Sequence, residues 1–295
     1  MKVIVTGATG FIGNHVTDLL YRDGWNVLAV ARSAQKSNVQ ELDLMDKERT
    51  KGVLKEFKPD YLLHLAWNVE SGYENSPDNL SWLISSLELL KSFYECGGSR
   101  AVFAGSCFEY DWRYGYLSEE FTPLVPNSFY GVSKKNLYEA ASAYALRVGL
   151  SFAWGRVFFL YGEGEKDDRL IPYIIRSVLS GVSPSIRQPS LVRDYMHVKD
   201  VASAFIKLLS SNYNGALNIA SGEGVKLGEI SGMIARIVGR KITDVLPVPF
   251  SLEEYPLVVG NIRRLYEELS FKPQMCLFDG LEMTVKGYKG KSDVC

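Results

Sequence analysis

The sequence predicts an α/β fold: a doubly wound parallel sheet with helices on both faces, followed by a smaller C-terminal domain. Short apolar strands alternate with amphipathic helices from residue 1 to about residue 162, and this alternation implies parallel strands joined by right-handed crossovers. Three glycines form a tight turn between the first strand and the first helix, as in sheets of this kind. After residue 162 the elements shorten and the loops become richer in glycine, proline and charge, which marks the second domain.

The N-terminal turn favours nucleotide binding. Residues 3–5 (Val-Ile-Val) are a β-branched run typical of a strand buried on both faces, and a helical pattern begins at Phe11. Gly7, Gly10 and Gly13 have G-x-x-G-x-x-G spacing. They permit the turn, the approach of a pyrophosphate and the close packing of helix on strand. A glycine trio also serves turns without a ligand, but the flanking strand and helix favour the functional interpretation.

The remaining elements follow in order. We expect strands at 25–30, 39–40, 61–65, 101–105 and 151–160, and helices at 46–57, 78–96 and 126–147. Ligands bind at the carboxyl edge of such sheets. Residues 1–162 are therefore expected to form a Rossmann-type NAD(P)-binding domain, with a later strand and helix from about 190–220. Residues 163–295 are expected to form mainly a substrate-binding domain.

Composition argues against several classes of function. A net charge of −1 in 295 residues gives no reason to expect nucleic acid or a membrane as a partner. No apolar stretch approaches the roughly 20 residues that span a bilayer, and the N-terminal apolar run is too short for a signal peptide. Cys96, Cys107, Cys276 and Cys295 show no C-x-x-C spacing. We therefore expect no metal site, no disulfide framework and a reducing, cytoplasmic setting.

The residues after the second and third strands bear on the choice of cofactor. Dinucleotide folds usually place an acid after the second strand to bind the ribose hydroxyls, whereas Arg32 follows it here. A guanidinium suits a 2′-phosphate, so Arg32 favours NADP over NAD; an exposed arginine after a strand is the alternative. Asp43 follows the third strand and could accept from the adenine amino group or be a solvated loop acid.

A catalytic group is predicted from Tyr130, Lys134 and Ser106. Tyr130 and Lys134 are four residues apart and share one face of a helix. An ammonium beside a phenol favours the phenolate, so we expect the pKa of Tyr130 to fall below its usual value of about 10. Such a group serves as an acid or base for a carbinol or carbonyl, and Lys134 could also bond the nicotinamide ribose. Ser106 ends a strand and could donate to the same substrate oxygen or cap a helix.

Together these residues resemble the extended short-chain dehydrogenase/reductase family, the NAD(P)-dependent epimerases and dehydratases of nucleotide sugars. The resemblance covers nearly the whole chain, and chance agreement of its segments in this order is rare. The matching segments are 6–13 (TGATGFIG), 61–66 (YLLHLA), 105–110, Tyr130 with Lys134, 156–162 (RVFFLYG), 193–200 (RDYMHVKD) and 218–222 (NIASG).

The resemblance implies roles for particular residues. Those for the cofactor are Gly7, Gly10, Phe11, Ile12 and Gly13 at the pyrophosphate, Asp43 and Leu44 beside adenine, and Leu65 and Ala66 along the groove. Tyr130 and Lys134 would carry out the proton transfer with Ser106. Arg193 would bind the diphosphate of a nucleotide-sugar substrate; an exposed loop arginine paired with Asp194 is the alternative. The resemblance also implies a homodimer through the helices near 78–97 and 128–148.

Departures from the family pattern narrow the choice among the reactions that the family catalyses. Cys107-Phe108 stands where the 4,6-dehydratases have an Asp-Glu pair, which argues against dehydration. Phe159 replaces an asparagine that would contact substrate, and Arg32 replaces the acid of NAD-retaining epimerases. Segment 109–115 (EYDWRYG) is aromatic and charged and could pack or line the sugar pocket.

Three functions follow from these observations. The first expectation is an NADPH-dependent reductase of a 4-keto nucleotide sugar, in which Tyr130 donates the proton. The second is an NAD-dependent nucleotide-sugar epimerase with a retained cofactor. The third is a non-catalytic NADP-sensing protein, which the presence of both Tyr130 and Lys134 disfavours.

Overall fold

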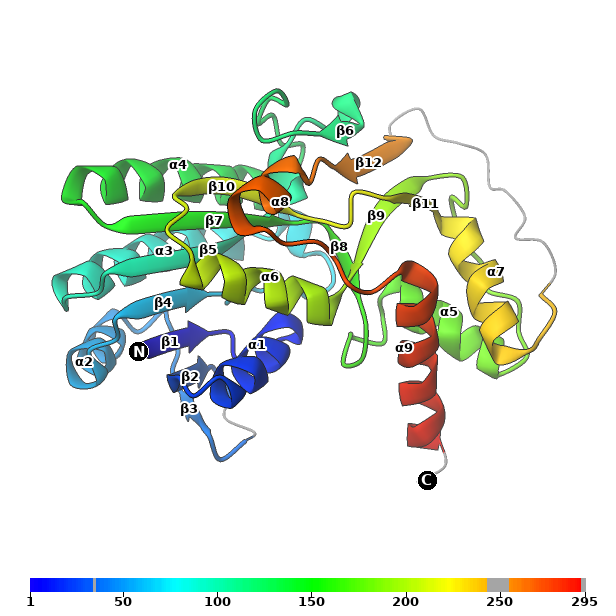
Figure 1. Ribbon diagram of the computed structural model, residues 1–295, viewed down its shortest axis with the longest axis horizontal. Coiled ribbons are helices and arrows are strands. Elements are labelled where there is room, and N and C mark those ends of the chain that lie inside the picture. The colour runs from blue at the N-terminus through cyan, green and yellow to red at the C-terminus, as the bar shows by residue number, and fades with distance from the viewer. Residues whose placement is uncertain (34–35, 243–254, 293–295) are drawn as a thin grey trace.

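A seven-stranded parallel sheet forms the centre of the molecule. The computed structural model describes residues 1–33, 36–242 and 255–292, and its large sheet has the order β10-β7-β5-β4-β1-β2-β3 (Figure 1). The strands are β1 (Lys2–Thr6), β2 (Asn26–Ala31), β3 (Val39–Glu41), β4 (Tyr61–His64), β5 (Arg100–Ser106), β7 (Ser151–Val157) and β10 (Gly215–Ile219). The order reverses between β1 and β4, so the predicted doubly wound α/β fold is confirmed.

Helices cover the two faces of this sheet in separate layers. One layer contains α1 (Phe11–Arg22) and α6 (Val198–Ser210), and the other contains α2 (Lys47–Phe57), α3 (Asp78–Glu95) and α4 (Phe129–Val148). Alternate residues of β1 join the two layers: Val3 and Val5 pack with α1 and α6, whereas Ile4 packs with the opposite helices. A β-branched run without polar residues is therefore required, because successive side chains point to opposite faces.

Most predicted boundaries agree with the structure to within one residue, and two elements differ by more. The helix expected from residue 126 begins at Phe129, because Ser128 is extended and its hydroxyl accepts from the Gly131 amide at 3.1 Å. The strand expected over 151–160 is two strands, β7 and β8 (Phe159–Tyr161). The chain leaves the large sheet after Val157, and β8 pairs instead with β9 (Val192–His197).

The rest of the chain packs beside the carboxyl edge of the sheet. A second sheet has the order β11-β9-β12-β6, with β6 at Tyr116–Leu117, β11 at Gly224–Lys226 and β12 at Leu257–Gly260. The helices are α5 (Leu170–Leu179), α7 (Leu227–Val238), α8 (Arg263–Leu269) and α9 (Leu277–Ser292). Helices α5, α7 and α9 share a hydrophobic core of their own, and they stand to the right of the large sheet in Figure 1.

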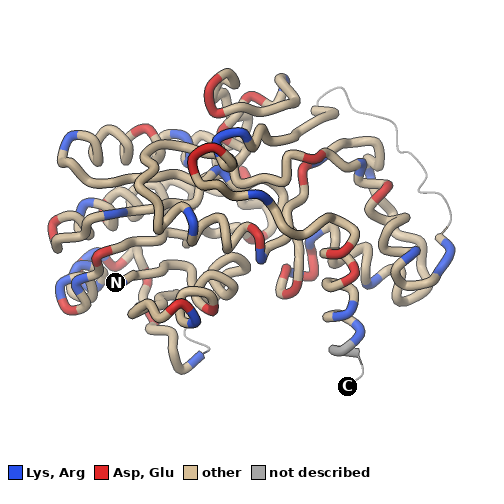
Figure 2. The backbone as a smooth tube through the Cα atoms, in the orientation of Figure 1, with Lys and Arg blue, Asp and Glu red and all other residues tan. Residues whose placement is uncertain are grey.

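Charge is spread widely over the molecule. Basic and acidic residues are interspersed along most elements in Figure 2, as the net charge of −1 leads one to expect. Within the described ranges no helix is both long and apolar enough to cross a bilayer. Cys96, Cys107 and Cys276 carry free thiols, and Cys295 lies outside the described residues.

Candidate active site

The glycine turn is built by close contacts between backbones. Gly7 has φ +70°, and a Cβ at this position would lie 2.8 Å from the Ala66 nitrogen. A Cβ at Gly13 would overlap the Gly7 carbonyl oxygen, and the Gly10 amide donates to the same oxygen at 2.9 Å. Only glycine fits at Gly7 and Gly13, because β1, the turn, α1 and the chain after β4 leave no room for a side chain.

This turn leaves the N-terminus of α1 ready for an anion. Gly10 is the N-cap and provides no capping side chain, and the first turn of α1 contains no acidic residue. The backbone amides of Phe11 and Ile12 begin the helix, where an unpaired N–H and the helix dipole attract negative charge. Leu65 and Ala66 lie against the turn. The residues predicted for the pyrophosphate are therefore together, and they fit a dinucleotide.

The residues predicted for the adenosine end lie after neighbouring strands. Arg32 follows β2, is exposed, and places its guanidinium carbon 5.7 Å from the centroid of the Trp82 ring. Asp43 is also exposed, and one of its carboxylate oxygens accepts from the Met45 amide at 3.0 Å. Leu44 is buried. Arg32 is thus free to reach a ligand, whereas part of the Asp43 carboxylate stabilises its own turn.

Ser106, Tyr130 and Lys134 are brought together, and all three are buried. Ser106 is the last residue of β5, and its side chain is close enough to Tyr130 to influence the pKa of the phenol. The Ser106 hydroxyl also accepts from the Phe108 amide at 3.3 Å, so the residue caps a short helix as well. The Lys134 ammonium donates to the Ala104 carbonyl at 2.9 Å and lies 3.8 Å from the Trp67 ring centroid.

Burial governs the protonation of this group. Burial raises the pKa of Tyr130 well above its usual value, although the hydrogen bond from Ser106 opposes the change. Burial lowers the pKa of Lys134 to about 7, and the charge of Glu109 opposes this shift. The expectation of a lowered tyrosine pKa is wrong, because the ammonium lies against Trp67 and 5.9 Å from the Tyr130 ring centroid. Tyr130 therefore keeps its proton at neutral pH.

Aromatic rings hold the Tyr130 ring in place. Tyr73, in the short helix η1 (Tyr73–Asn75), meets it edge-on with centroids 4.9 Å apart. Phe108, in η2 (Cys107–Glu109), and Trp67 approach to 5.7 and 6.0 Å. These contacts could not be predicted from the sequence, because segments far apart in the chain supply the rings and no spacing signals their contact.

Arg193 lies in β9 and is only 8% exposed. Its guanidinium donates to the carbonyls of Val192 and Tyr255 at 2.8 and 3.0 Å, and it lies 5.7 Å from the ring centroids of both Trp112 and Phe159. The alternative of an exposed arginine paired with Asp194 is wrong. The Asp194 carboxylate instead accepts from Ser221 and from the amides of Gly222 and Gly260.

Segment 109–115 divides into two parts. Glu109 and Tyr110 are buried and belong to the interior behind Ser106. The short helix η3 (Trp112–Tyr114) contains no buried residue, and Trp112 contacts Phe108 with ring centroids 4.6 Å apart. The place of Glu109 has one signal in the sequence, the S-x-x-E spacing from Ser106, which forms a capping box here.

The fold and this site define the class of extended short-chain dehydrogenase/reductase proteins, as the resemblance indicated. The chain belongs to the NAD dependent epimerase/dehydratase family, whose model matches residues 3–220. It is 26% identical to a UDP-glucose 4-epimerase of Mycolicibacterium smegmatis over 99% of this chain and 100% of that protein. It is also 26% identical to a GDP-6-deoxy-D-mannose reductase of Pseudomonas aeruginosa over 98% of each protein. The structure of Thermus thermophilus UDP-glucose 4-epimerase in complex with NAD superimposes with a TM-score of 0.86 at 26% identity, over 98% of this chain and 99% of that one.

The depressed pKa of Lys134 predicts a pH dependence of stability. Lys134 titrates at about 7 in the fold and at about 10 in an unfolded chain. Between these values the unfolded chain binds more protons, so the contribution of Lys134 to stability rises with pH. In urea unfolding of the cofactor-free protein, the free energy of unfolding of wild type should increase relative to that of Lys134→Met from pH 7 to about 9. Lys135→Met, at a neighbouring position where the lysine pairs with Glu139 on the surface, is the control. A trend shared by both variants would contradict the assignment to Lys134.

Proposed function

We propose that the protein is a nicotinamide-dependent oxidoreductase that transfers hydride at C4 of a nucleotide-linked hexose. The observation that carries this proposal is the buried group of Ser106, Tyr130 and Lys134, with Ser106 beside Tyr130 and Lys134 one helical turn from it. This group lies on the sheet whose glycine turn presents the N-terminus of α1 to an anion. The nucleotide-sugar substrates named for the epimerase and reductase relatives support the choice of substrate class.

Each residue of the group has a distinct role in the proposed reaction. A nicotinamide dinucleotide held at the glycine turn would supply the hydride for C4. Tyr130 gives its phenolic proton to the ketone oxygen, which becomes the alcohol, and it regains a proton from solvent. Ser106 holds the oxygen in line, and the Lys134 ammonium, 5.9 Å from the Tyr130 ring centroid, supplies a positive charge on the side of the phenolate left on Tyr130. A tyrosine that keeps its proton at neutral pH suits this direction of reaction.

Reduction with NADPH is the first candidate, and Arg32 favours it. Its exposed guanidinium follows β2 and lies over the Trp82 ring, where a 2′-phosphate could accept paired hydrogen bonds. Epimerisation with retained NAD is the second candidate. The similarity to UDP-glucose 4-epimerases over almost the whole chain favours it, and so does the NAD in the Thermus complex.

We also propose how the chain is divided and assembled. Residues 1–162, together with α6 and β10, would bind the cofactor, and most of 163–295 would bind the sugar nucleotide, with Arg193 at its diphosphate. A homodimer would form through α3 and α4, on which Leu80, Ile84 and Leu146 are exposed apolar residues. Sedimentation of the purified chain as a monomer at micromolar concentration would overturn the dimer.

Tyr130→Phe tests the proposed chemistry. Wild type is mixed with NADPH and with GDP- or dTDP-linked 4-keto-6-deoxyhexose, and separately with UDP-glucose without added cofactor. Nicotinamide absorbance and sugar products are followed together. Loss of the phenolic proton should lower kcat by about 10²-fold or more. NADPH loss matched by 4-hydroxy product supports the reductase, and UDP-galactose formation supports the epimerase. Turnover by Tyr130→Phe equal to wild type would refute the proposed role of Tyr130.

Arg32→Ala tests the choice of cofactor. Charge-assisted hydrogen bonds to a phosphate contribute about 1.5–3 kcal/mol. The ratio of NADPH to NADH affinity should therefore fall about tenfold or more, while NADH affinity changes little. Titration of nicotinamide fluorescence measures both affinities. Equal losses for the two cofactors would assign Arg32 to packing against Trp82.

A further inference from the structure

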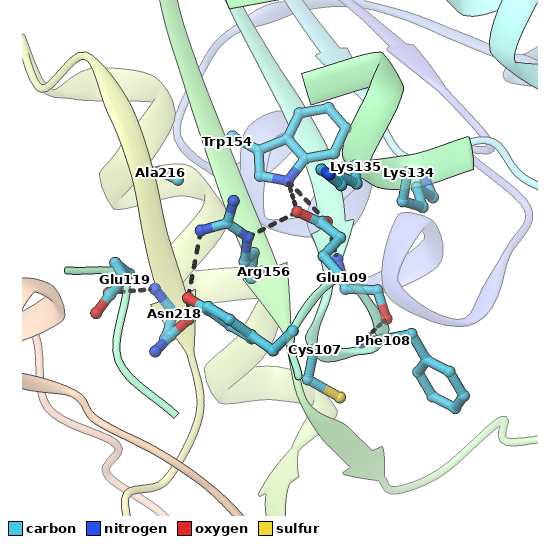
Figure 3. A network of polar contacts seen from close by, with 12 residues as sticks. Cys107, Phe108, Glu109, Glu119, Lys134, Lys135, Trp154, Arg156, Ala216 and Asn218 are labelled. Atoms are coloured by element: carbon cyan, nitrogen blue, oxygen red, sulfur yellow. Dashed lines mark hydrogen bonds and ion pairs between the residues drawn. The ribbon is translucent and has the colours of Figure 1, made fainter. Parts of the chain in front are cut away.

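Glu109 is a carboxylate buried directly behind the catalytic group. It has no exposed surface. One of its oxygens, Oε1, accepts from the Ser106 amide at 2.8 Å and from the Trp154 indole at 2.9 Å. The other, Oε2, accepts from Nε of Arg156 at 2.6 Å. Figure 3 shows the carboxylate pointing toward Trp154 and Arg156, with Lys134 on the neighbouring helix.

The end of β5 is shaped to admit this carboxylate. A Cβ at Gly105 would overlap the Trp154 indole nitrogen and lie 2.6 Å from Oε1 of Glu109. Glycine is therefore required for the indole and carboxylate to reach the backbone just before Ser106. The Ser106 amide is fixed by Glu109, and this fixes the turn that directs the Ser106 hydroxyl toward Tyr130.

Glu109 also acts on the catalytic group through space, by its charge. The Lys134 ammonium lies 6.0 Å from the ring centroid of Trp154, the indole that donates to Glu109. Burial depresses the pKa of Lys134, and the charge of Glu109 is the influence that raises it. Glu109 therefore favours the ammonium form, although it makes no direct contact with that group.

Arg156 holds Glu109 from the other side. Its guanidinium carbon lies 4.9 Å from the ring centroids of both Tyr110 and Tyr138, and Nη1 donates to the Tyr110 hydroxyl at 3.3 Å. The Tyr110 hydroxyl donates in turn to Asn218 at 2.7 Å. A buried ion pair is weak evidence for stability, because well-packed apolar residues often replace one without loss. The pair does, however, hold the carboxylate at one place relative to Ser106.

We propose that Glu109 is a positioning residue of the active site: it orients Ser106 through the backbone amide and places a fixed negative charge near Lys134. The inference rests on the proposed function of Ser106, Tyr130 and Lys134. Glu109 acts through Ser106 and Lys134 and touches no substrate.

Two substitutions separate the two effects. Glu109→Gln keeps the size of the side chain and removes its charge, so the alkaline fall in kcat/KM should move to lower pH by about one unit. Glu109→Asp keeps the charge and withdraws it from the Ser106 amide. We therefore expect kcat to fall about tenfold or more, while the alkaline fall in kcat/KM stays at the same pH. KM for the cofactor should stay constant in both variants. The substrates are those of the Tyr130→Phe assay.

Glu119→Gln is the matched control. Glu119 accepts a hydrogen bond from the backbone amide of Asn218 at 2.7 Å in the same polar network (Figure 3). Its charge, however, is not among the influences on the pKa of Lys134. Its pH profile and kcat should equal those of wild type. Because Glu109→Gln leaves Arg156 buried without its counterion, the double variant Glu109→Gln/Arg156→Gln is made in parallel and should show the same shift of the alkaline limb.

The outcomes distinguish this inference from the proposed function. If Tyr130→Phe is inactive while the Glu109 variants match Glu119→Gln in kcat and pH profile, the inference alone is wrong. If wild type turns over none of the probes, the proposed function fails, and urea unfolding still tests the charge effect. In a protein that already contains Glu109→Gln and Arg156→Gln, the effect of Lys134→Met on the free energy of unfolding should begin to change at a lower pH than it does in wild type. An unchanged pH would overturn the inference.

Discussion

The contact between the Gly7 turn and the chain after β4 is the constraint on which the rest of the site depends. Gly7 and the Leu65–Ala66 backbone are so close that a single Cβ would separate them, and they meet at the point where the strand order of the sheet reverses. The crevice beside such a reversal is where open α/β sheets bind ligands. Backbone groups form this part of the site, and the side chains proposed to do the chemistry are supplied from β5 and α4. The proposed cofactor binding and proton transfer would consequently be set by different segments of one sheet.

Burial then imposes a cost on every charge in the catalytic group. Tyr130 and Lys134 are both displaced toward their neutral forms, because a low-dielectric interior disfavours ionised groups. A catalytic tyrosine must be able to exchange its proton, so the surroundings have to limit this effect. The hydrogen bond from Ser106 does so for Tyr130, and the charge of Glu109 does so for Lys134. Glu109, which lies behind β5, therefore acts on the protonation of Lys134, just as Ser106 acts on that of Tyr130.

The local parts of this site could be predicted from the sequence, and the non-local parts could not. The glycine turn and the Tyr130–Lys134 spacing are encoded within a few residues, because a βα turn and one helical turn fix their geometry. The rings of Trp67 and Tyr73 meet Tyr130 only through tertiary packing, so no periodicity signals them. The direction of the Tyr130 pKa was predicted wrongly for the same reason: adjacency in a helix is visible in the sequence, but burial is not. Glu109 is an intermediate case, since S-x-x-E was readable as a cap but its pairing with Arg156 was not.

Reduction and epimerisation differ less in chemistry than in how long the cofactor stays bound. Both proposed reactions use hydride transfer at C4 and proton transfer through Tyr130, so the Ser106–Tyr130–Lys134 geometry alone does not distinguish them. The difference lies at the adenosine end, where an enzyme that retains its cofactor gains from an acid bonded to both ribose hydroxyls. Arg32 makes no such bond, and its exposed position favours a ligand that exchanges with solvent. Phe159 adds a second difference, because an aromatic ring packs against Arg193 at the position where the family pattern has an asparagine. The polar contact that this asparagine would offer to substrate is therefore missing, whichever of the two proposed reactions takes place.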